Sequence, residues 1–272
     1  MEESSDSSRS RPAIPANVKR QVRRRCGFGC VVCGALLYEY DHLHGWANTH
    51  THEPSGIVLL CDQHHREKTV GLLPIDRVIA ANENPANRKK RESAAHVLHY
   101  HGSEYEVSLA GMKFVVPASR VGSLLVPLMI DDEPIVIFRV EDEHLLLSFN
   151  YYDESNRLAL RIKNNELVYR TDVWDIEFIG KNLKLRKGKR EIILDLAFEP
   201  PTKIAIDCAR INRNGVTIIV DSDFVHVPNM NAKVGKIGAF RSQVGIVAGR
   251  ISEETTKVAA ITFPISESDR LP

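Results

Sequence analysis

Residues 26–34 read CGFGCVVCG, which places three of the chain's five cysteines within eight positions. Such a cluster is typical of a disulfide framework, a redox pair or one half of a metal site. Five cysteines leave at least one thiol unpaired, and structural disulfides are rare in reducing compartments. The disulfide interpretation is therefore the weakest of the three.

A second pair of ligand-type residues follows this cluster. Cys30-x2-Cys33 is separated by 27 residues from Cys61-x2-His64. Three thiolates and one imidazole in two close pairs are the ligand set of a closed tetrahedral zinc site. A thioredoxin-like redox pair, or cysteines buried only as packing residues, would leave this second pair unexplained. We predict that these four residues bind structural zinc and that Cys26 is a packing residue at a helix end.

Short helices and strands are expected around these ligands. Asn17 is the expected N-cap of a first helix. The other expected elements are strands within 35–46 and 56–61, and helices within 61–71 and 74–84. Gly71 and Pro85 are the expected stops of these two helices, because neither residue favours continuation of a helix.

The composition divides the chain into two parts. Residues 1–102 contain nine of the 11 histidines and four of the five cysteines, and their formal charge is +3, whereas the rest carries −2. From about residue 104, short β-type runs recur every ten residues or so, separated by Gly, Pro or Asn-Asn. This pattern is typical of a β-sandwich or a β-solenoid. Because no strict repeat is present, we favour the sandwich.

We therefore predict an α+β protein with a disordered polar tail over 1–12, a metal-binding module over 13–83, a linker over 84–103 and a mainly antiparallel, sandwich-like β domain over 104–272. No run of residues reaches the roughly 18 apolar positions of a membrane span. The first residues also lack the apolar centre of a signal peptide. A cytoplasmic protein without membrane contact is expected.

Asp41, His42 and His65 remain once the zinc ligands are assigned. Consecutive residues on a helix point about 100° apart, so His64 can face zinc while His65 faces a second site. Lys68 follows three residues later on the side of His65. A lone histidine is more often a surface or core residue, and only the joint pattern favours a functional site.

These motifs together resemble the HNH endonucleases of the ββα-metal, or His-Me finger, class. The resemblance rests on Cys30-x2-Cys33, YDHLHGW (40–46), LLCDQHH (59–65) and Lys68, and it covers about residues 25–75. In that family a two-stranded hairpin and a helix hold one catalytic divalent ion, and zinc pairs of this kind brace the module. The resemblance implies a zinc-braced ββα-metal module that hydrolyses phosphodiester bonds in DNA.

The resemblance also implies individual roles. His42 would be the general base that deprotonates the attacking water. Asp41 and His65 would bind the catalytic ion, Mg²⁺ or another divalent cation. Because neighbours on a regular strand point to opposite faces, Asp41 and His42 serve one site only if the strand ends or bulges there.

Two positions depart from the family pattern. Gly56 stands where the family has its central Asn, and His52 and Asn48 are the two residues that could substitute for it. His64 stands where the family more often has a cysteine, which is also a zinc ligand.

Basic residues on both sides of the motif are expected to bind DNA phosphates. They are Lys19, Arg20, Arg23 and Arg24 on the exposed face of the first helix, together with Lys68, Arg88, Lys89 and Lys90. The alternative is that they are ordinary solvated helix faces. Since no base-reading motif is evident, we expect contacts mainly to the backbone and no sequence specificity.

The β domain contains no catalytic motif, so we expect it to regulate or target the nuclease through a protein partner or self-association. This expectation is an analogy with bacterial restriction and anti-phage modules. It predicts that residues 13–100 alone cut DNA at a different rate or with a different preference from the whole chain. The alternative functions are a non-catalytic zinc-binding module for nucleic acid or protein, and a structural β-scaffold.

Overall fold

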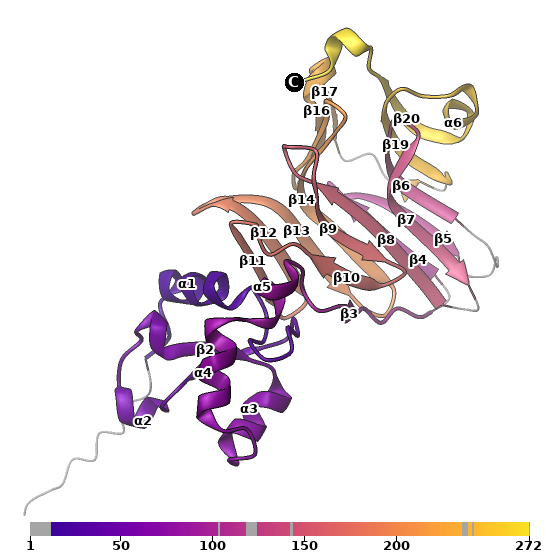
Figure 1. The fold of residues 1–272 in the computed structure, drawn as a ribbon. Coiled ribbons are helices and arrows are strands. Elements are labelled where there is room, and N and C mark those ends of the chain that lie inside the picture. Colours follow the sequence, from indigo (N-terminus) through magenta and orange to yellow (C-terminus); the bar gives the residue numbers. More distant parts are fainter. Residues whose placement is uncertain are drawn as a thin grey trace, which may run out of the picture. The chain divides into compact units, whose positions relative to one another are not determined.

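The structure is a computed structural model that describes residues 12–102, 104–117, 124–141, 144–235, 239–240 and 242–271. The chain forms two compact units, Met1–Lys90 (unit 1) and Arg91–Pro272 (unit 2) (Figure 1). The expected tail falls almost wholly outside the described residues. The expected linker, 84–103, contains the boundary between the units and also two short regular elements, α5 (Ala86–Lys90) and β3 (His96–Val97).

Unit 1 is a small mixed unit built around one antiparallel pair of strands. Its elements are α1 (Ala16–Cys26), β1 (Glu39–His42), α2 (Trp46–Thr49), the short 3-10 turn η1 (Pro54–Gly56), β2 (Ile57–Leu60), α3 (Asp62–Thr69), α4 (Ile75–Glu83) and α5 (Ala86–Lys90). β1 pairs with β2 in continuous register, from Glu39 opposite Leu60 to His42 opposite Ile57. The pair is followed directly by α3.

The core of unit 1 lies on β2. All four residues of Ile57–Leu60 are fully buried, because this run is apolar on both faces of the strand. Val22 and Cys26 from α1 and Val78 from α4 belong to the same buried cluster. β2 is therefore the element on which the surrounding helices are positioned.

The ends of α1 follow simple backbone rules, although its start differs from our expectation. Pro15 occupies the N-cap position and the helix begins at Ala16, so the predicted cap at Asn17 was wrong. Proline suits this position because it has no N–H to leave unpaired. Gly27 ends the helix by adopting a left-handed backbone conformation with φ of 72°.

Unit 2 consists almost entirely of two β-sheets. The first contains, in spatial order, β20 (Ala259–Pro264), β19 (Val244–Gly249), β6 (Leu124–Ile130), β7 (Glu133–Glu141), β8 (His144–Tyr152), β9 (Leu158–Lys163), β10 (Glu166–Tyr169) and β3 (His96–Val97). The second contains β11 (Asp175–Ile179), β12 (Asn182–Gly188), β13 (Glu191–Glu199), β14 (Lys203–Arg213), β15 (Val216–Val220), β16 (Phe224–Val227) and β17 (Ala232–Gly235), with β4 (Glu104–Leu109), β5 (Met112–Pro117) and β18 (Ala239–Phe240) beside them. The short helical segments of unit 2 are η2 (Pro228–Met230), α6 (Glu253–Val258) and η3 (Glu267–Asp269).

Most neighbouring strands of unit 2 are antiparallel, as expected. The parallel pairs are β19 with β6 and β20, β4 with β14, and β5 with β18. Alternate residues of β8 are buried, so one face of this strand belongs to the core. The Tyr151 hydroxyl donates to the carbonyl of Ile193 at 3.4 Å, which links β8 of one sheet to β13 of the other. Successive antiparallel hairpins fit a layered β domain better than a solenoid of parallel coils.

Among the described residues, no helix has the length and apolarity that a membrane span requires.

Candidate functional site

Four predicted zinc ligands lie together in unit 1. The ligand atoms of Cys30, Cys33, Cys61 and His64 are all within 4.8 Å of one another. The Sγ atoms of Cys33 and Cys61 are 3.8 Å apart, and Nδ1 of His64 is 3.5 Å from Sγ of Cys30 and 3.1 Å from Sγ of Cys61. Tetrahedral zinc, with bonds of about 2.3 Å to sulfur and 2.0 Å to nitrogen, implies separations of about 3.8 Å between thiolates and about 3.5 Å between thiolate and imidazole. These residues can therefore hold a structural metal ion such as zinc.

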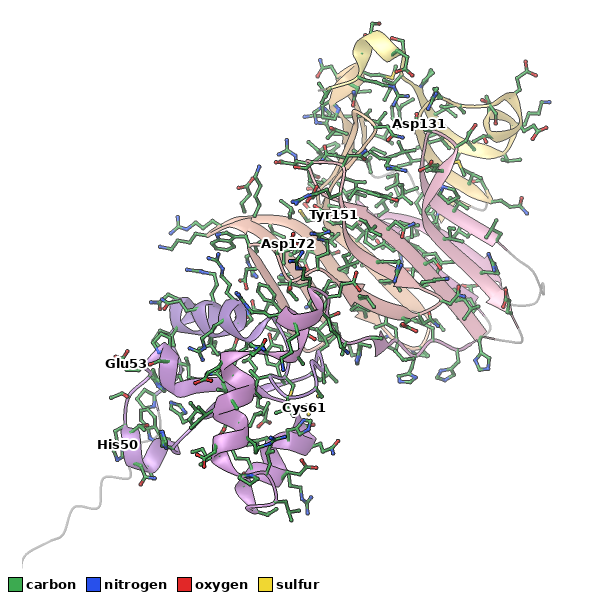
Figure 2. All side chains as sticks on the ribbon, viewed as in Figure 1. His50, Glu53, Cys61, Asp131, Tyr151 and Asp172 are labelled. Atoms are coloured by element: carbon green, nitrogen blue, oxygen red, sulfur yellow. The ribbon has the colours of Figure 1, made fainter. Side chains whose placement is uncertain are left out.

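Local backbone geometry brings the two halves of the cluster together. The amide of Gly34 donates to the carbonyl of Cys30 at 2.7 Å and closes a tight turn over 30–33. The amide of Val31 donates to the carbonyl of Leu59 at 2.9 Å, which attaches this turn to β2. Cys61 follows β2 directly and occupies the N-cap position of α3, where Figure 2 labels it. The cluster thus joins the turn, β2 and the first turn of α3.

The thiols of the cluster influence one another. The hydrogen bond with Cys33 lowers the pKa of the Cys30 thiol to about 4. The same hydrogen bond, together with burial, raises the pKa of the Cys33 thiol. Burial also raises the pKa of the Cys61 thiol, so Cys30 is the thiol of the cluster that favours thiolate, the form that binds metal.

Cys26 lies outside the cluster. It is the last residue of α1 and is completely buried in the core of unit 1. Burial raises the pKa of its thiol, and its Sγ is 3.7 Å from Oδ1 of Asn82. Its position is that of a packing residue at a helix end.

Asp41 and His65 also lie together, on the face of β1 that meets α3. Nε2 of His65 is 3.4 Å from Oδ1 of Asp41, and Nδ1 of His65 is 3.1 Å from Oε2 of Glu39. Sequence reasoning missed Glu39, although residues two apart on a strand share a face and this rule could have found it. The two carboxylates of β1 therefore approach the two nitrogens of one imidazole.

Lys68 is engaged by the same group of side chains. Its Nζ is 2.5 Å from Oδ2 of Asp41 and donates to the carbonyl of His42 at 2.9 Å. The side chains of Lys68 and Asp41 are only 14% and 12% exposed, so this is a largely desolvated ion pair. Through these two contacts Lys68 holds the end of β1 in place, apart from any contact that it makes with a bound phosphate.

His42 belongs to a different group of side chains from Asp41. Its side chain is buried, its Nε2 is 3.3 Å from Nδ1 of His52, and its ring packs edge-on against Trp46. β1 contains no bulge, so Asp41 and His42 point to opposite faces as strand alternation requires. The structure brings Asp41 to His65, and His42 to His52.

The position of Gly56 is open. Within the part of the chain that the structure describes, no atom outside its chain neighbours lies within 4 Å of where a Cβ would be. Two residues could substitute for the missing Asn. His52 contacts His42, whereas the side-chain amide of Asn48 donates to the carbonyl of His44 at 2.8 Å.

The predicted phosphate-binding residues have different environments. Arg23 was expected on the exposed face of α1, but it is only 4% exposed and donates to the hydroxyl of Tyr40 at 2.9 Å. The expectation failed because this side of α1 packs against the strands. Arg88 is exposed, and its guanidinium donates twice to the carbonyl of Arg24, at 2.7 and 3.2 Å, at the end of α1.

The other basic residues have exposed or partly exposed side chains. Lys19 lies over the ring of Tyr40, with Nζ 5.6 Å from the ring centre, and is half-buried like Arg20. Arg24, Lys89 and Lys90 are exposed. These five residues retain the exposure that a phosphate contact requires.

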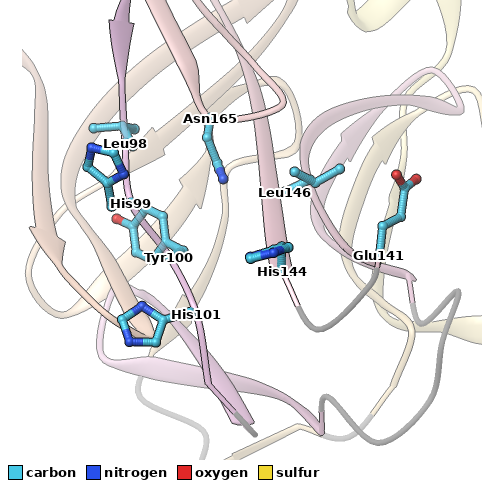
Figure 3. Close-up of a pocket in the computed structure, with 8 residues that line it drawn as sticks. All are labelled: Leu98, His99, Tyr100, His101, Glu141, His144, Leu146 and Asn165. Atoms are coloured by element: carbon cyan, nitrogen blue, oxygen red, sulfur yellow. The ribbon is translucent and has the colours of Figure 1, made fainter.

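Unit 2 contains a pocket of about 520 Å³ that is rich in histidine (Figure 3). It is lined by Leu98, His99, Tyr100, His101, Glu141, His144, Leu146 and Asn165. The three imidazoles belong to no group with metal-ligand spacing, because the only such group among the described residues is that of Cys30. The side chain of Asn165 is buried. Its Nδ2 donates to the carbonyl of Leu145, and its Oδ1 accepts from the amide of Leu147.

Comparison with protein-family models, with curated proteins and with solved structures finds no match to this chain.

Proposed function

We propose that unit 1 is a metal-dependent DNA endonuclease of the HNH type. The observation that carries this proposal is the contact between Asp41 on β1 and His65 on α3, next to a Cys₃His cluster that joins β2 to α3. An antiparallel strand pair followed by a helix, with one acidic and one imidazole ligand between them, matches what the sequence resemblance implies. A role in restriction or anti-phage defence extends the proposal by analogy.

The donor set of Asp41 and His65 suits a divalent ion. Neighbouring ligands at about 2.1 Å in octahedral geometry are separated by about 3.0 Å, close to the 3.4 Å between Oδ1 of Asp41 and Nε2 of His65. Mg²⁺ typically keeps several waters and needs few protein ligands. When bound, such an ion would stabilise charge on the phosphate and on the leaving oxygen.

The chain's own residues would prepare the reaction. His42 would accept a proton from the attacking water. Lys68 would hold the carboxylate of Asp41 through Oδ2, and so leave Oδ1 directed at His65. Through the carbonyl of His42, Lys68 also fixes the backbone from which the general base projects.

Plasmid nicking by the full-length chain tests this function. We expect nicking with Mg²⁺, Mn²⁺ or Ni²⁺, and a loss of about 10²- to 10⁴-fold in His42→Ala because the general base is removed. Zinc content should remain at one per chain in this variant. His44→Ala is the matched control, since His44 is an exposed histidine two residues away, and it should nick like the wild type.

Two outcomes would contradict the proposal. Nicking that is unchanged in His42→Ala would show that His42 is not the base. Absence of nicking with all three ions would favour the second candidate function.

The second candidate is a non-catalytic zinc-binding module for nucleic acid or protein. Three observations favour it. Lys68 already neutralises Asp41, and Asp41 and His42 point to opposite faces of β1. His42 is also only 3% exposed, whereas a general base must meet water. DNA binding that requires zinc, without cleavage in any of these divalent ions, is the result expected for such a module.

A further inference from the structure

A chain of polar contacts leads from His42 to the backbone of the N-terminal segment. Nε2 of His42 is 3.3 Å from Nδ1 of His52, and Nε2 of His52 is 3.0 Å from the carbonyl oxygen of Pro12. The ring of His52 is also stacked on Trp46, with ring centres 4.7 Å apart and planes inclined by 26°. His52 is thus held by stacking on its ring face and by polar contacts of both ring nitrogens.

The direction of the hydrogen bonds in this chain follows from the acceptor at its end. A backbone carbonyl can only accept, so Nε2 of His52 must carry a proton. In a neutral imidazole the other nitrogen is then an acceptor, so Nδ1 of His52 must accept from His42. His42 consequently donates from Nε2–H, and its lone pair lies on Nδ1.

We infer that His52 is a positioning residue that holds the proton of neutral His42 on Nε2 and thereby places the lone pair of the proposed general base on Nδ1. The catalytic part of this inference rests on the proposed nuclease function. The part that concerns the proton on His42 depends only on the contacts of the ring.

Two sets of contacts orient His42. The amide of Gly45 and Nζ of Lys68 both donate to its carbonyl, at 3.0 and 2.9 Å, which fixes the backbone. His52 and Trp46 contact the ring itself. At Gly56 there is no side chain to reach the ring, so His52 supplies an acceptor that this position cannot. Hydrogen-bond partners of this kind select the tautomer and orientation of a histidine.

The chain offers a matched set of variants. His52→Phe keeps an aromatic ring for Trp46 but removes the acceptor. His52→Asn removes the ring but supplies a side-chain oxygen near the position of Nδ1. His50→Asn is the control, because His50 also packs against Trp46, is exposed, and has a positive φ of 48° that asparagine tolerates.

Two measurements on the full-length chain test the inference. The first is the nitrogen-15 spectrum of the His42 ring at about pH 8, well above the usual histidine pKa of about 6.5. The proton should be on Nε2 in the wild type, in His52→Asn and in His50→Asn, and it should be distributed over both nitrogens in His52→Phe. The second is plasmid nicking, in which we expect kcat to fall about 10- to 100-fold in His52→Phe with little change in KM, and to recover in His52→Asn.

The outcomes separate this inference from the proposed function. A wild-type His42 protonated on Nδ1 would overturn the inference, as would a His52→Phe variant with an unchanged His42 spectrum. If the wild type does not nick DNA, the proposed function fails, while the spectrum still decides whether His52 holds the proton of His42. Because the wild-type spectrum needs no substitution, the inference stays testable even if His52→Phe does not fold.

Discussion

Asp131, labelled in Figure 2, joins separate segments of unit 2 through one buried carboxylate. Its oxygens accept hydrogen bonds from the guanidinium of Arg270 at 2.7 and 3.0 Å, from the amide of Arg250 at 2.8 Å and from the side chain of Asn214 at 3.2 Å. Burial raises the pKa of Asp131, but these hydrogen bonds, led by that from Arg270, outweigh burial and hold the pKa below its usual 3.8. The side chains of Asp131 and Arg270 are 3% and 10% exposed.

Asp131→Asn should therefore destabilise unit 2 by about 3 kcal/mol, because it leaves the buried Arg270 charge with only the exposed carboxylate of Glu267 as a partner. The contribution of Asp131 is fully present above its unfolded pKa near 3.8 and is lost as the pH falls through its lower folded value. Urea unfolding monitored from pH 7 down to pH 2 measures both effects. Glu141→Gln is the control: Glu141 pairs with Arg139 at the surface, and its loss should change stability by less than about 1 kcal/mol. Equal effects of the two substitutions would contradict this account.

At the scale of single residues, the direction of each side chain along β1 also decides which neighbours it contacts. Residue identity alone marked Asp41, His42 and His65 as reactive, but the alternation of the strand assigns Asp41 and His42 to separate neighbours. The same alternation places Glu39 with Asp41 on the face of His65. A role for Asp41 in the proposed nuclease is therefore tied to His65 rather than to the residue next to it in sequence.

At the scale of elements, α3 begins at the Cys₃His cluster. The helix has only eight residues and none of them is buried, so neither its length nor apolar packing stabilises it strongly. Cys61 and His64 lie at its first turn, where a bound metal would attach the helix to β2 and to the turn at Cys30.

Removal of zinc by a strong chelator should consequently unfold α3 and loosen β1 and β2, because metal binding contributes directly to folding in such small modules. The protection of unit 2 against hydrogen exchange should be unchanged. Hydrogen exchange of residues 57–71, measured together with that of unit 2, gives both results in one experiment. Cys61→Ala should produce the same loss of protection, whereas Cys208→Ala, on β14 and outside the cluster, should leave the zinc content at one per chain. Unchanged protection after complete removal of zinc would contradict a structural role for the metal.

At the scale of the whole molecule, the excess of positive charge belongs to the part of the chain that contains the candidate site. Some of the predicted basic residues have structural roles, since Arg23 is buried, Lys68 is paired with Asp41 and Arg88 binds the end of α1. Lys89 and Lys90, at the end of α5, are exposed. They are therefore the clearest remaining test of DNA contact.

Replacing both Lys89 and Lys90 by alanine should weaken binding to duplex DNA of any sequence. If each lysine neutralises one phosphate, the slope of log K against log salt should become shallower by about 1.8, from about 0.9 per contact. The control is the exposed pair Arg161 and Lys163 in unit 2, whose replacement should leave the slope unchanged. An equal loss of affinity in both double variants would argue against a specific role for α5.

The sequence by itself determined the Cys₃His group that could hold a metal ion, the strands and helices that carry it, the two-part organisation and the mainly antiparallel β-structure of unit 2. These features depend on local chemistry and periodicity: ligand type, spacing along a helix, and apolar runs interrupted by turn residues. Of the candidate site, the ligands Cys30, Cys33, Cys61 and His64 could be found in this way. Their convergence could be expected because the intervening segment has strand character and returns the chain.

Only the tertiary structure decided which side chains meet. The burial of Arg23 depends on which face of α1 packs against the strands, and the contact of His52 with His42 depends on the path of the chain through α2 and η1. Asp131 and Arg270 are 139 positions apart, and no local pattern relates them. Such contacts follow from long-range packing. The burial of β2 and of the two sheets fixes where the backbone lies, and each buried polar group then pairs with the partner that lies within hydrogen-bond distance.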